Sequence, residues 1–154
     1  MRSAKQVPAK KTPRTGFAIT MELSAEMVAN CLCSAFEGGG SRYWCSIRRE
    51  VAPRGELAFR SSDKQIIPFI GNRGIDVAQD GGGGAVSLED SEAEDEKGKP
   101  KRYRLTRTAL RRGLAVMAAD YPRHFANLVG EMMSDAETGD VLLQCSVLGE
   151  VRYG

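Results

Sequence analysis

The last third of the chain, residues 106–149, most constrains the fold because it carries three consecutive helical patterns with no strand pattern between them. Apolar residues recur there at spacings of three and four, as on one face of a helix. Asp120 and Pro122 predict the N-cap and the first turn of the second helix, and Thr138 or Ser134 caps the third. The expected buried face of the third helix is Val141, Leu142, Cys145 and Leu148.

One earlier helix is predicted between Ser24, a favourable N-cap, and Gly38, a favourable C-terminal stop. The stretch "RYWCSIRREVA" at 42–52 is rich in aromatic and β-branched residues and predicts a strand. A long β-hairpin is expected further on, with arms at Ala85–Glu89 and Lys101–Leu105. Shorter strands are possible in "ELAFR" and "QIIPFI", although Pro68 restricts the second of these to an edge or a bend.

This order of elements, a helix, then grouped strands, then grouped helices, is typical of the α+β class. We expect an antiparallel sheet with the N-terminal helix and the C-terminal helices packed on one face. A chain of 154 residues suits one domain, which we place at residues 21–154.

The charges are segregated, although the net charge is only +2. Residues 1–16 hold basic side chains and no acidic ones, so we expect residues 1–20 to form a mobile basic tail. The stretch "EDSEAEDEKGKP" at 89–100 is too polar to pack, and we expect a flexible, acidic, exposed loop there.

Other classes of protein are disfavoured by what the chain lacks. No apolar run is long enough for a membrane span, and the N-terminus lacks the apolar core of a signal peptide, so we expect a cytoplasmic protein. Cys31 and Cys33 point to opposite sides of a helix, which suits neither a disulfide nor a shared metal. We expect free thiols, no metal and no cofactor.

No catalytic signature is present. The run "DGGGGA" lacks the Lys-Ser/Thr of a phosphate-binding loop, and neither G-x-S-x-G nor H-E-x-x-H occurs. The single histidine, His124, is expected at a helix surface or half-buried. We therefore expect a protein that is not an enzyme.

Two motifs at opposite ends of the chain carry a family resemblance. They are "AFEGGGSRYW" at 35–44 and "QCSVLGEVRYG" at 144–154, the second preceded by the acidic helix start "DAETGDVLLQ". The chain resembles a family of small proteins from tailed bacteriophages and prophages, which carry an N-terminal A-x-E-G-G…Y-W and end in Q-x-x-L-F-G-E-x-x-Y-G. Two departures are an extra residue or more before Tyr43 and Leu148 in place of an aromatic. Family members begin near the position of Met21.

The resemblance implies a phage origin but no chemistry. Small phage proteins of this kind are often accessory factors that inhibit a host defence, and we extend this role to the chain by association alone. They act either by binding a host bacterial protein, as anti-CRISPR proteins do, or by sequestering a nucleotide messenger. We expect such a protein to work by stoichiometric binding in the host cytoplasm, and a nucleotide site to form in an oligomer.

The candidate binding residues come from the two motifs, whose turns could meet in a compact domain. Flat aromatic rings and bare glycine backbone suit a base or an apolar anchor. They are Glu37, Gly38, Gly39, Tyr43, Trp44, Gln144, Glu150 and Tyr153. The competing interpretation is that the aromatics are core residues and that the glycines only end a helix.

A different class of function, a nucleic-acid-binding regulator, is the alternative. Residues 97–112 are strongly basic, and such clusters neutralise phosphates. The candidates are Lys101, Arg102, Arg104, Arg107, Arg111 and Arg112. The neighbouring acidic residues cancel much of that field, and the arginines suit the solvated face of an amphipathic helix equally well.

Overall fold

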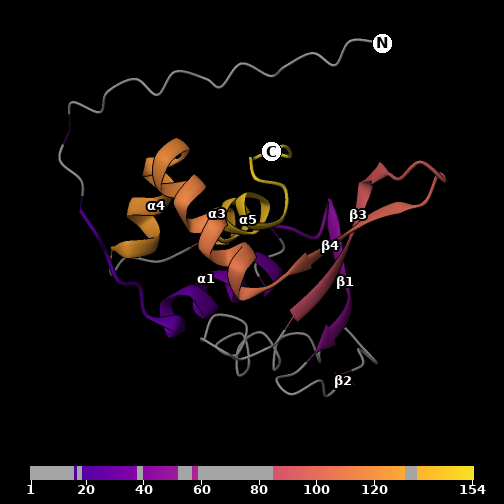
Figure 1. The fold of residues 1–154 in the computed structure, drawn as a ribbon, viewed down its shortest axis with the longest axis horizontal. Helices are drawn as coiled ribbons and strands as arrows, with labels where there is room; N and C mark the ends of the chain where they lie inside the picture. Colours follow the sequence, from indigo (N-terminus) through magenta and orange to yellow (C-terminus); the bar gives the residue numbers. More distant parts are fainter. Residues whose placement is uncertain (1–15, 17–18, 38–39, 52–56, 59–84, 131–134) are drawn as a thin grey trace, which may run out of the picture.

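The computed structural model describes residues 16, 19–37, 40–51, 57–58, 85–130 and 135–154. The elements, in chain order, are α1 (Ala25–Glu37), β1 (Cys45–Val51), β2 (Leu57–Ala58), β3 (Ala85–Glu94), β4 (Pro100–Leu105), α3 (Arg107–Asp120), α4 (Pro122–Val129) and α5 (Ala136–Val147). The predicted α+β class is confirmed, with helices on one side of an antiparallel sheet (Figure 1). The strand expected in "QIIPFI", and all of residues 1–20 except Gly16, Ile19 and Thr20, lie outside the described residues.

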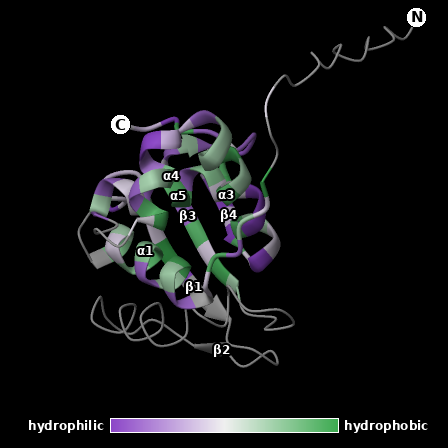
Figure 2. Cartoon of the chain, turned by 90° about the vertical axis from the view of Figure 1, so that its left-hand side faces the viewer, coloured by the Kyte–Doolittle hydropathy of each residue, from purple (hydrophilic) through white to green (hydrophobic). Residues whose placement is uncertain are grey.

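The sheet has the strand order β2-β1-β3-β4, and every neighbouring pair is antiparallel. Ile47 of β1 lies opposite Leu88 of β3, and Leu88 lies opposite Tyr103 of β4. Since side chains alternate along a strand, Val86, Leu88 and Asp90 all point to the buried face. The hydrophobic colouring is concentrated around α1 and β3, where the helices meet the sheet (Figure 2).

Helix α5 lies at the centre of the helical layer, between α1 and α3. We expected one buried face, but every residue from Thr138 to Ser146 is buried. That one-sided expectation was wrong because neighbours cover the helix on all sides, as happens when a helix is the core of its domain.

Two glycines allow this close packing. A Cβ added at Gly139 of α5 would lie 2.7 Å from the backbone nitrogen of Ala35 in α1. A Cβ at Gly113 of α3 would lie 2.6 Å from the Cα of Ser146 in α5. Both separations are too short for a real side chain, so the absence of a Cβ sets how near α1 and α3 approach α5.

The helix starts are partly as predicted. The Oγ of Ser24 accepts a hydrogen bond from the backbone N–H of Met27 and caps α1, as expected. Two expected N-caps were wrong. Tyr121, not Asp120, precedes α4, because Asp120 is the last residue of α3. The N-cap of α5 is Asp135, whose carboxylate accepts from the N–H of Thr138, so Thr138 is inside the helix.

The predicted hairpin is present, but its first arm was placed too short. Strand β3 continues past Glu89 to Glu94, and three residues bulge out between Asp90 and Glu94. Asp95 then closes the turn, because its Oδ1 accepts from the backbone N–H groups of Lys97 and Lys99. The loop is therefore five residues with its own hydrogen bonds, and it extends beyond the packed body (Figure 1).

All four cysteines lie in the described part of the chain, where none is in a disulfide, and all except Cys33 are buried. None of the described helices is both long and apolar enough to cross a membrane.

Candidate functional site

Helix α5 carries four buried polar side chains, and two of them, Asp140 and Gln144, lie one turn apart. Both are surrounded by the mainly apolar core of the domain. A buried polar group destabilises the fold unless hydrogen bonds replace the lost water, so the partners of these two residues define the site.

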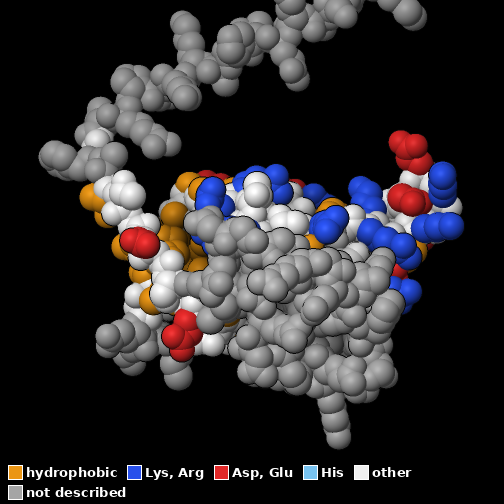
Figure 3. Space-filling model, turned by 60° about the horizontal axis from the view of Figure 1, so that its bottom comes forward, with side chains coloured by type: hydrophobic (Ala, Val, Ile, Leu, Met, Phe, Trp, Pro, Cys, Tyr) orange, Lys and Arg blue, Asp and Glu red, His pale blue; other side chains and the backbone are white. Residues whose placement is uncertain are grey.

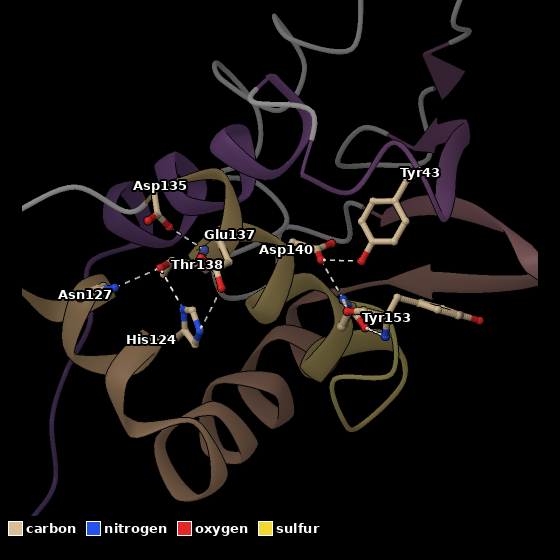
Figure 4. A network of polar contacts seen from close by, with 9 residues as sticks. Tyr43, His124, Asn127, Asp135, Glu137, Thr138, Asp140 and Tyr153 are labelled. Atoms are coloured by element: carbon tan, nitrogen blue, oxygen red, sulfur yellow. Dashed lines mark hydrogen bonds and ion pairs between the residues drawn. The ribbon is translucent and has the colours of Figure 1, made fainter.

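Asp140 accepts hydrogen bonds from residues of the turn before β1. Its Oδ1 accepts from the Ser41 hydroxyl at 2.6 Å and from the Trp44 indole N–H at 2.7 Å. Its Oδ2 accepts from the Gln144 amide at 2.7 Å and, at the surface, from the Tyr43 hydroxyl at 3.5 Å (Figure 4). The carboxylate therefore fixes the conformation of residues 41–44 against α5.

Gln144 in turn holds the C-terminal segment. Its Oε1 accepts from the backbone N–H groups of Arg152 and Tyr153, each at 2.8 Å. Its Nε2 donates to the Tyr153 carbonyl at 2.8 Å as well as to Asp140. The side-chain amide thus uses both donors and both acceptor positions, and the C-terminal segment is held against α5.

Tyr153 completes the link to the sheet. Its ring stacks on that of Trp44, with the ring centroids 5.2 Å apart, and its hydroxyl donates to both carboxylate oxygens of Asp90 at 3.0 and 3.2 Å. Asp90 is buried on β3 and also accepts from the N–H of Glu92. Two buried carboxylates, one on α5 and one on β3, are therefore joined through the Trp44–Tyr153 stack.

Burial and the carboxylates of Asp140 and Asp90 shift the pKa values of neighbouring titratable groups. Burial first, and the nearby Asp140 second, raise the pKa of Tyr43. Burial and the hydrogen bond to Asp90 raise the pKa of Tyr153. Burial also raises the pKa of Cys45, with Asp140 and Asp90 adding to the effect, so this thiol stays protonated and is a poor nucleophile.

The two motifs meet in space through four of the predicted residues, Tyr43, Trp44, Gln144 and Tyr153. Trp44 and Gln144 have no exposed surface, which agrees with their interpretation as core residues. Glu150 lies apart from this contact, at the surface, and pairs with Arg152 at 3.1 Å.

The remaining predicted positions belong to the first glycine turn. Glu37 ends α1, but its side chain is outside the described part of the chain, as are Gly38 and Gly39.

Sequence reasoning missed Ser41, Asp90 and Asp140, which are three of the groups that hold the cluster together. A signal existed for two of them. Asp140 and Gln144 are four positions apart in a helix whose other residues are mainly apolar, and Asp90 continues the buried alternation of Val86 and Leu88. Neither aspartate stood at an expected core position, because Asp90 falls in the segment expected as an exposed loop and Asp140 lies outside the expected buried face of the third C-terminal helix.

A second polar cluster joins α4 to the start of α5 (Figure 4). His124 is half-buried, as expected, with its Nδ1 3.2 Å from the hydroxyl of Thr138 and its Nε2 3.9 Å from Glu137. Hydrogen bonds from Thr138 lower the pKa of Asp135. Because Thr138 has no exposed surface, this hydroxyl positions the helices and does not face a substrate.

Next to the buried network, the turn residue Tyr43 and the hairpin tip are exposed to solvent. Tyr43 has half of its surface exposed, at 50%. The next residue, Trp44, accepts at its carbonyl from the backbone N–H of Ser91 at 2.8 Å, so Tyr43 lies at the base of the projecting hairpin. We call Tyr43 and the hairpin residues 92–99 the hairpin surface.

The basic candidates follow β4 and α3. Figure 3 shows Lys and Arg side chains spread across one face as far as the hairpin tip, where acidic side chains gather. Arg102 pairs with Glu89 at 3.3 Å, and Arg112 donates to the carbonyl of Ser146. The exposed members are Lys101, Arg102, Arg104, Arg111 and Arg112, and Arg107 is half-buried.

Within the described ranges, no three His, Cys, Asp or Glu side chains are grouped so as to hold a metal ion. Comparisons of the chain with protein-family models, with curated proteins and with solved structures gave no match.

Proposed function

We propose that this protein is a non-enzymatic phage accessory factor that binds a host bacterial protein stoichiometrically and thereby inhibits a host antiviral defence in the cytoplasm. The phage origin and the defence target rest on the resemblance of the two terminal motifs. The binding mode rests on one structural observation, the hairpin surface.

The hairpin surface has the properties of a recognition site. Tyr43 presents an aromatic ring to solvent, while Ser41 and Trp44 on either side of its turn are fixed by Asp140. A ring held in place before binding loses little conformational entropy in a complex, and tyrosine is enriched among residues that dominate binding energy. The side chains of the adjacent hairpin tip are exposed. Its backbone is nevertheless held in one turn by the hydrogen bonds that Asp95 accepts.

The geometry favours a protein partner over a nucleotide messenger. Of the two aromatic candidates in the first motif, Trp44 offers no free face to a base, because that indole is fully buried against Tyr153. A protein partner needs only the exposed Tyr43 and the charged tip, which carries Glu94, Asp95 and Glu96 beside Lys97 and Lys99.

Phage plating tests the defence function directly. The wild-type protein and the variant Tyr43→Ala are expressed in bacterial strains that each carry one antiviral defence system, and the efficiency of plating is compared with that of an empty vector. We expect the wild type to restore plating in at least one strain and Tyr43→Ala to restore it at least tenfold less. Restoration in no strain, or equal restoration by both proteins, would contradict the proposal.

A matched pair of charge variants tests the hairpin. Glu94→Lys with Glu96→Lys changes the tip, whereas Glu26→Lys changes an exposed acidic residue in the first turn of α1, far from it. We expect the tip variant to lose protection and Glu26→Lys to retain it, since the helix-terminus change costs only about 1 kcal/mol of stability.

A second function is favoured by the basic face of β4 and α3. Nucleic-acid binding predicts an affinity that falls steeply with salt and that weakens when Arg104 and Arg111 are changed to Glu. Anisotropy of a labelled DNA duplex at two salt concentrations separates the two functions, because Tyr43→Ala, which changes no charge, leaves this binding unchanged.

A further inference from the structure

A groove on the side of the molecule opposite the hairpin is not used by the proposed function. Its volume is about 830 Å³, and it lies between the extended segment Ile19–Ser24 and helices α1, α3 and α4. We call it the arm groove. Figure 3 shows hydrophobic side chains gathered beside this N-terminal segment.

The floor and walls of the arm groove are mainly apolar. Leu114 of α3 and Phe125 of α4 line it and are only partly buried, although both pack against the core. Ile19 and Met21 line the opposite wall with exposed fractions of 84% and 51%. Large apolar side chains this exposed are unusual for a surface that faces only water.

The charge at the rim is positive. Arg107 and Arg111 of α3 line the groove, and Glu22 is the acidic side chain that lines it. Two arginines against one glutamate leave the lining of the groove with a net positive charge on its α3 side.

We propose that the arm groove binds an acidic amphipathic helix of a protein partner, with its apolar face in the groove and its carboxylates toward α3. Such a helix presents apolar residues at i, i+3, i+4 and i+7, the spacing of groove-bound helices in general. This site is separate from the hairpin surface and rests on its own residues.

Other occupants fit less well. A second copy of this chain would bring the arginines of two α3 helices together, and like charges oppose that contact. A bilayer surface would match the positive charge, but a flat surface does not fill a groove. Nucleic acid would place phosphates and sugars against a mainly apolar floor, which suits an apolar helix face better.

The probe is a fluorescently labelled helical peptide of about four turns, with Leu at the i, i+3, i+4 and i+7 positions and Glu on its other face. Fluorescence anisotropy with the full chain measures its dissociation constant. A second peptide, with Lys in place of every Glu, tests the charge. We expect the Glu peptide to bind at least tenfold more tightly than the Lys peptide.

Two pairs of α3 variants locate the site, each pair about 100° apart on the helix. Ala118 and Arg111 line the groove, whereas the neighbouring exposed residues Ala119 and Arg112 do not. Ala118→Glu and Arg111→Glu are expected to weaken peptide binding at least tenfold, and Ala119→Glu and Arg112→Glu to change it less than twofold. Unfolding temperatures show whether each variant is folded.

Four results would overturn the proposal: no binding of the Glu peptide, equal binding of the Lys peptide, equal effects of the two members of a pair, or a dimer that forms through the groove. Binding to phosphatidylglycerol vesicles that Ala118→Glu abolishes, without binding of the Glu peptide, would likewise assign the groove to a membrane. The variant Tyr43→Ala is expected to bind the peptide normally, so that a failure of this inference and a failure of the proposed function are distinguishable.

Discussion

Trp44 and Asp140 lie 96 positions apart in the chain, and the indole N–H of Trp44 donates a 2.7 Å hydrogen bond to the carboxylate of Asp140. Both side chains are buried, so this contact fixes the turn before β1 against the central helix α5. The hairpin surface, which carries the proposed function, is built on that turn.

Asp140→Ala is expected to destabilise the protein by about 3 kcal/mol, because the buried donors of Ser41, Trp44 and Gln144 lose their acceptor. Asp140→Asn keeps an oxygen for Ser41 and Trp44 but turns an N–H₂ toward the Gln144 amide, so we expect a loss of about 1–2 kcal/mol. Urea unfolding measures both values. Equal stability of Asp140→Ala and wild type would show that the carboxylate does not organise the core.

Tyr153→Ala is expected to expose Trp44, the single tryptophan of the chain, because it removes the stacked ring. The fluorescence emission should shift to longer wavelength, and quenching by acrylamide should increase. Tyr153→Phe is the control, since it keeps the stack and loses only the hydrogen bonds to Asp90. An unchanged spectrum in Tyr153→Ala would contradict the docked position of the C-terminal segment.

The sequence was enough to predict the elements whose ends are set by local residue types. It was not enough to predict burial that depends on contacts with other elements. The cap at Ser24, the stop after α1 and the hairpin followed from residue types that act within one turn of chain. The all-round burial of α5 did not, because it depends on α1 and α3 approaching it at Gly139 and Gly113. The meeting of the two motifs was foreseen only as a possibility, since the residue that joins them, Asp140, looks like a surface residue in isolation.

Gly139→Ala is expected to destabilise the protein by about 1–3 kcal/mol, because the new methyl group would collide with the backbone of Cys31 and Ala35. In an exposed helix the same change would be stabilising by about 1 kcal/mol, so the sign of the effect is informative. Thermal unfolding measures it, with Gly16→Ala as a control whose added Cβ meets nothing. An increase in stability would contradict the close contact of α1 and α5.

The stability should fall as the pH rises above about 9. Burial raises the pKa of Cys145 from 9.0 to about 11, and it raises the pKa values of Cys45 and Tyr153 as well. The unfolded chain therefore loses protons first, so the stabilisation is complete below pH 9.0 and, for Cys145, is lost between 9.0 and about 11.

Chemical unfolding at a series of pH values from neutral upward gives the free energy of unfolding at each. Cys145→Ala removes one of the titrating groups, so its stability should depend less steeply on pH, although the variant is less stable at neutral pH. A free energy of unfolding that stays constant from neutral pH to pH 11 would show that these groups are not buried as described.

The most direct test of stoichiometric binding is native mass spectrometry of the protein purified from a bacterial lysate, with Tyr43→Ala and Tyr43→Phe in parallel. The account predicts one defined complex with a host protein at a fixed ratio, retained in Tyr43→Phe, which keeps the ring, and lost in Tyr43→Ala. A bare protein in every sample, or the same complex in Tyr43→Ala as in the wild type, would contradict it.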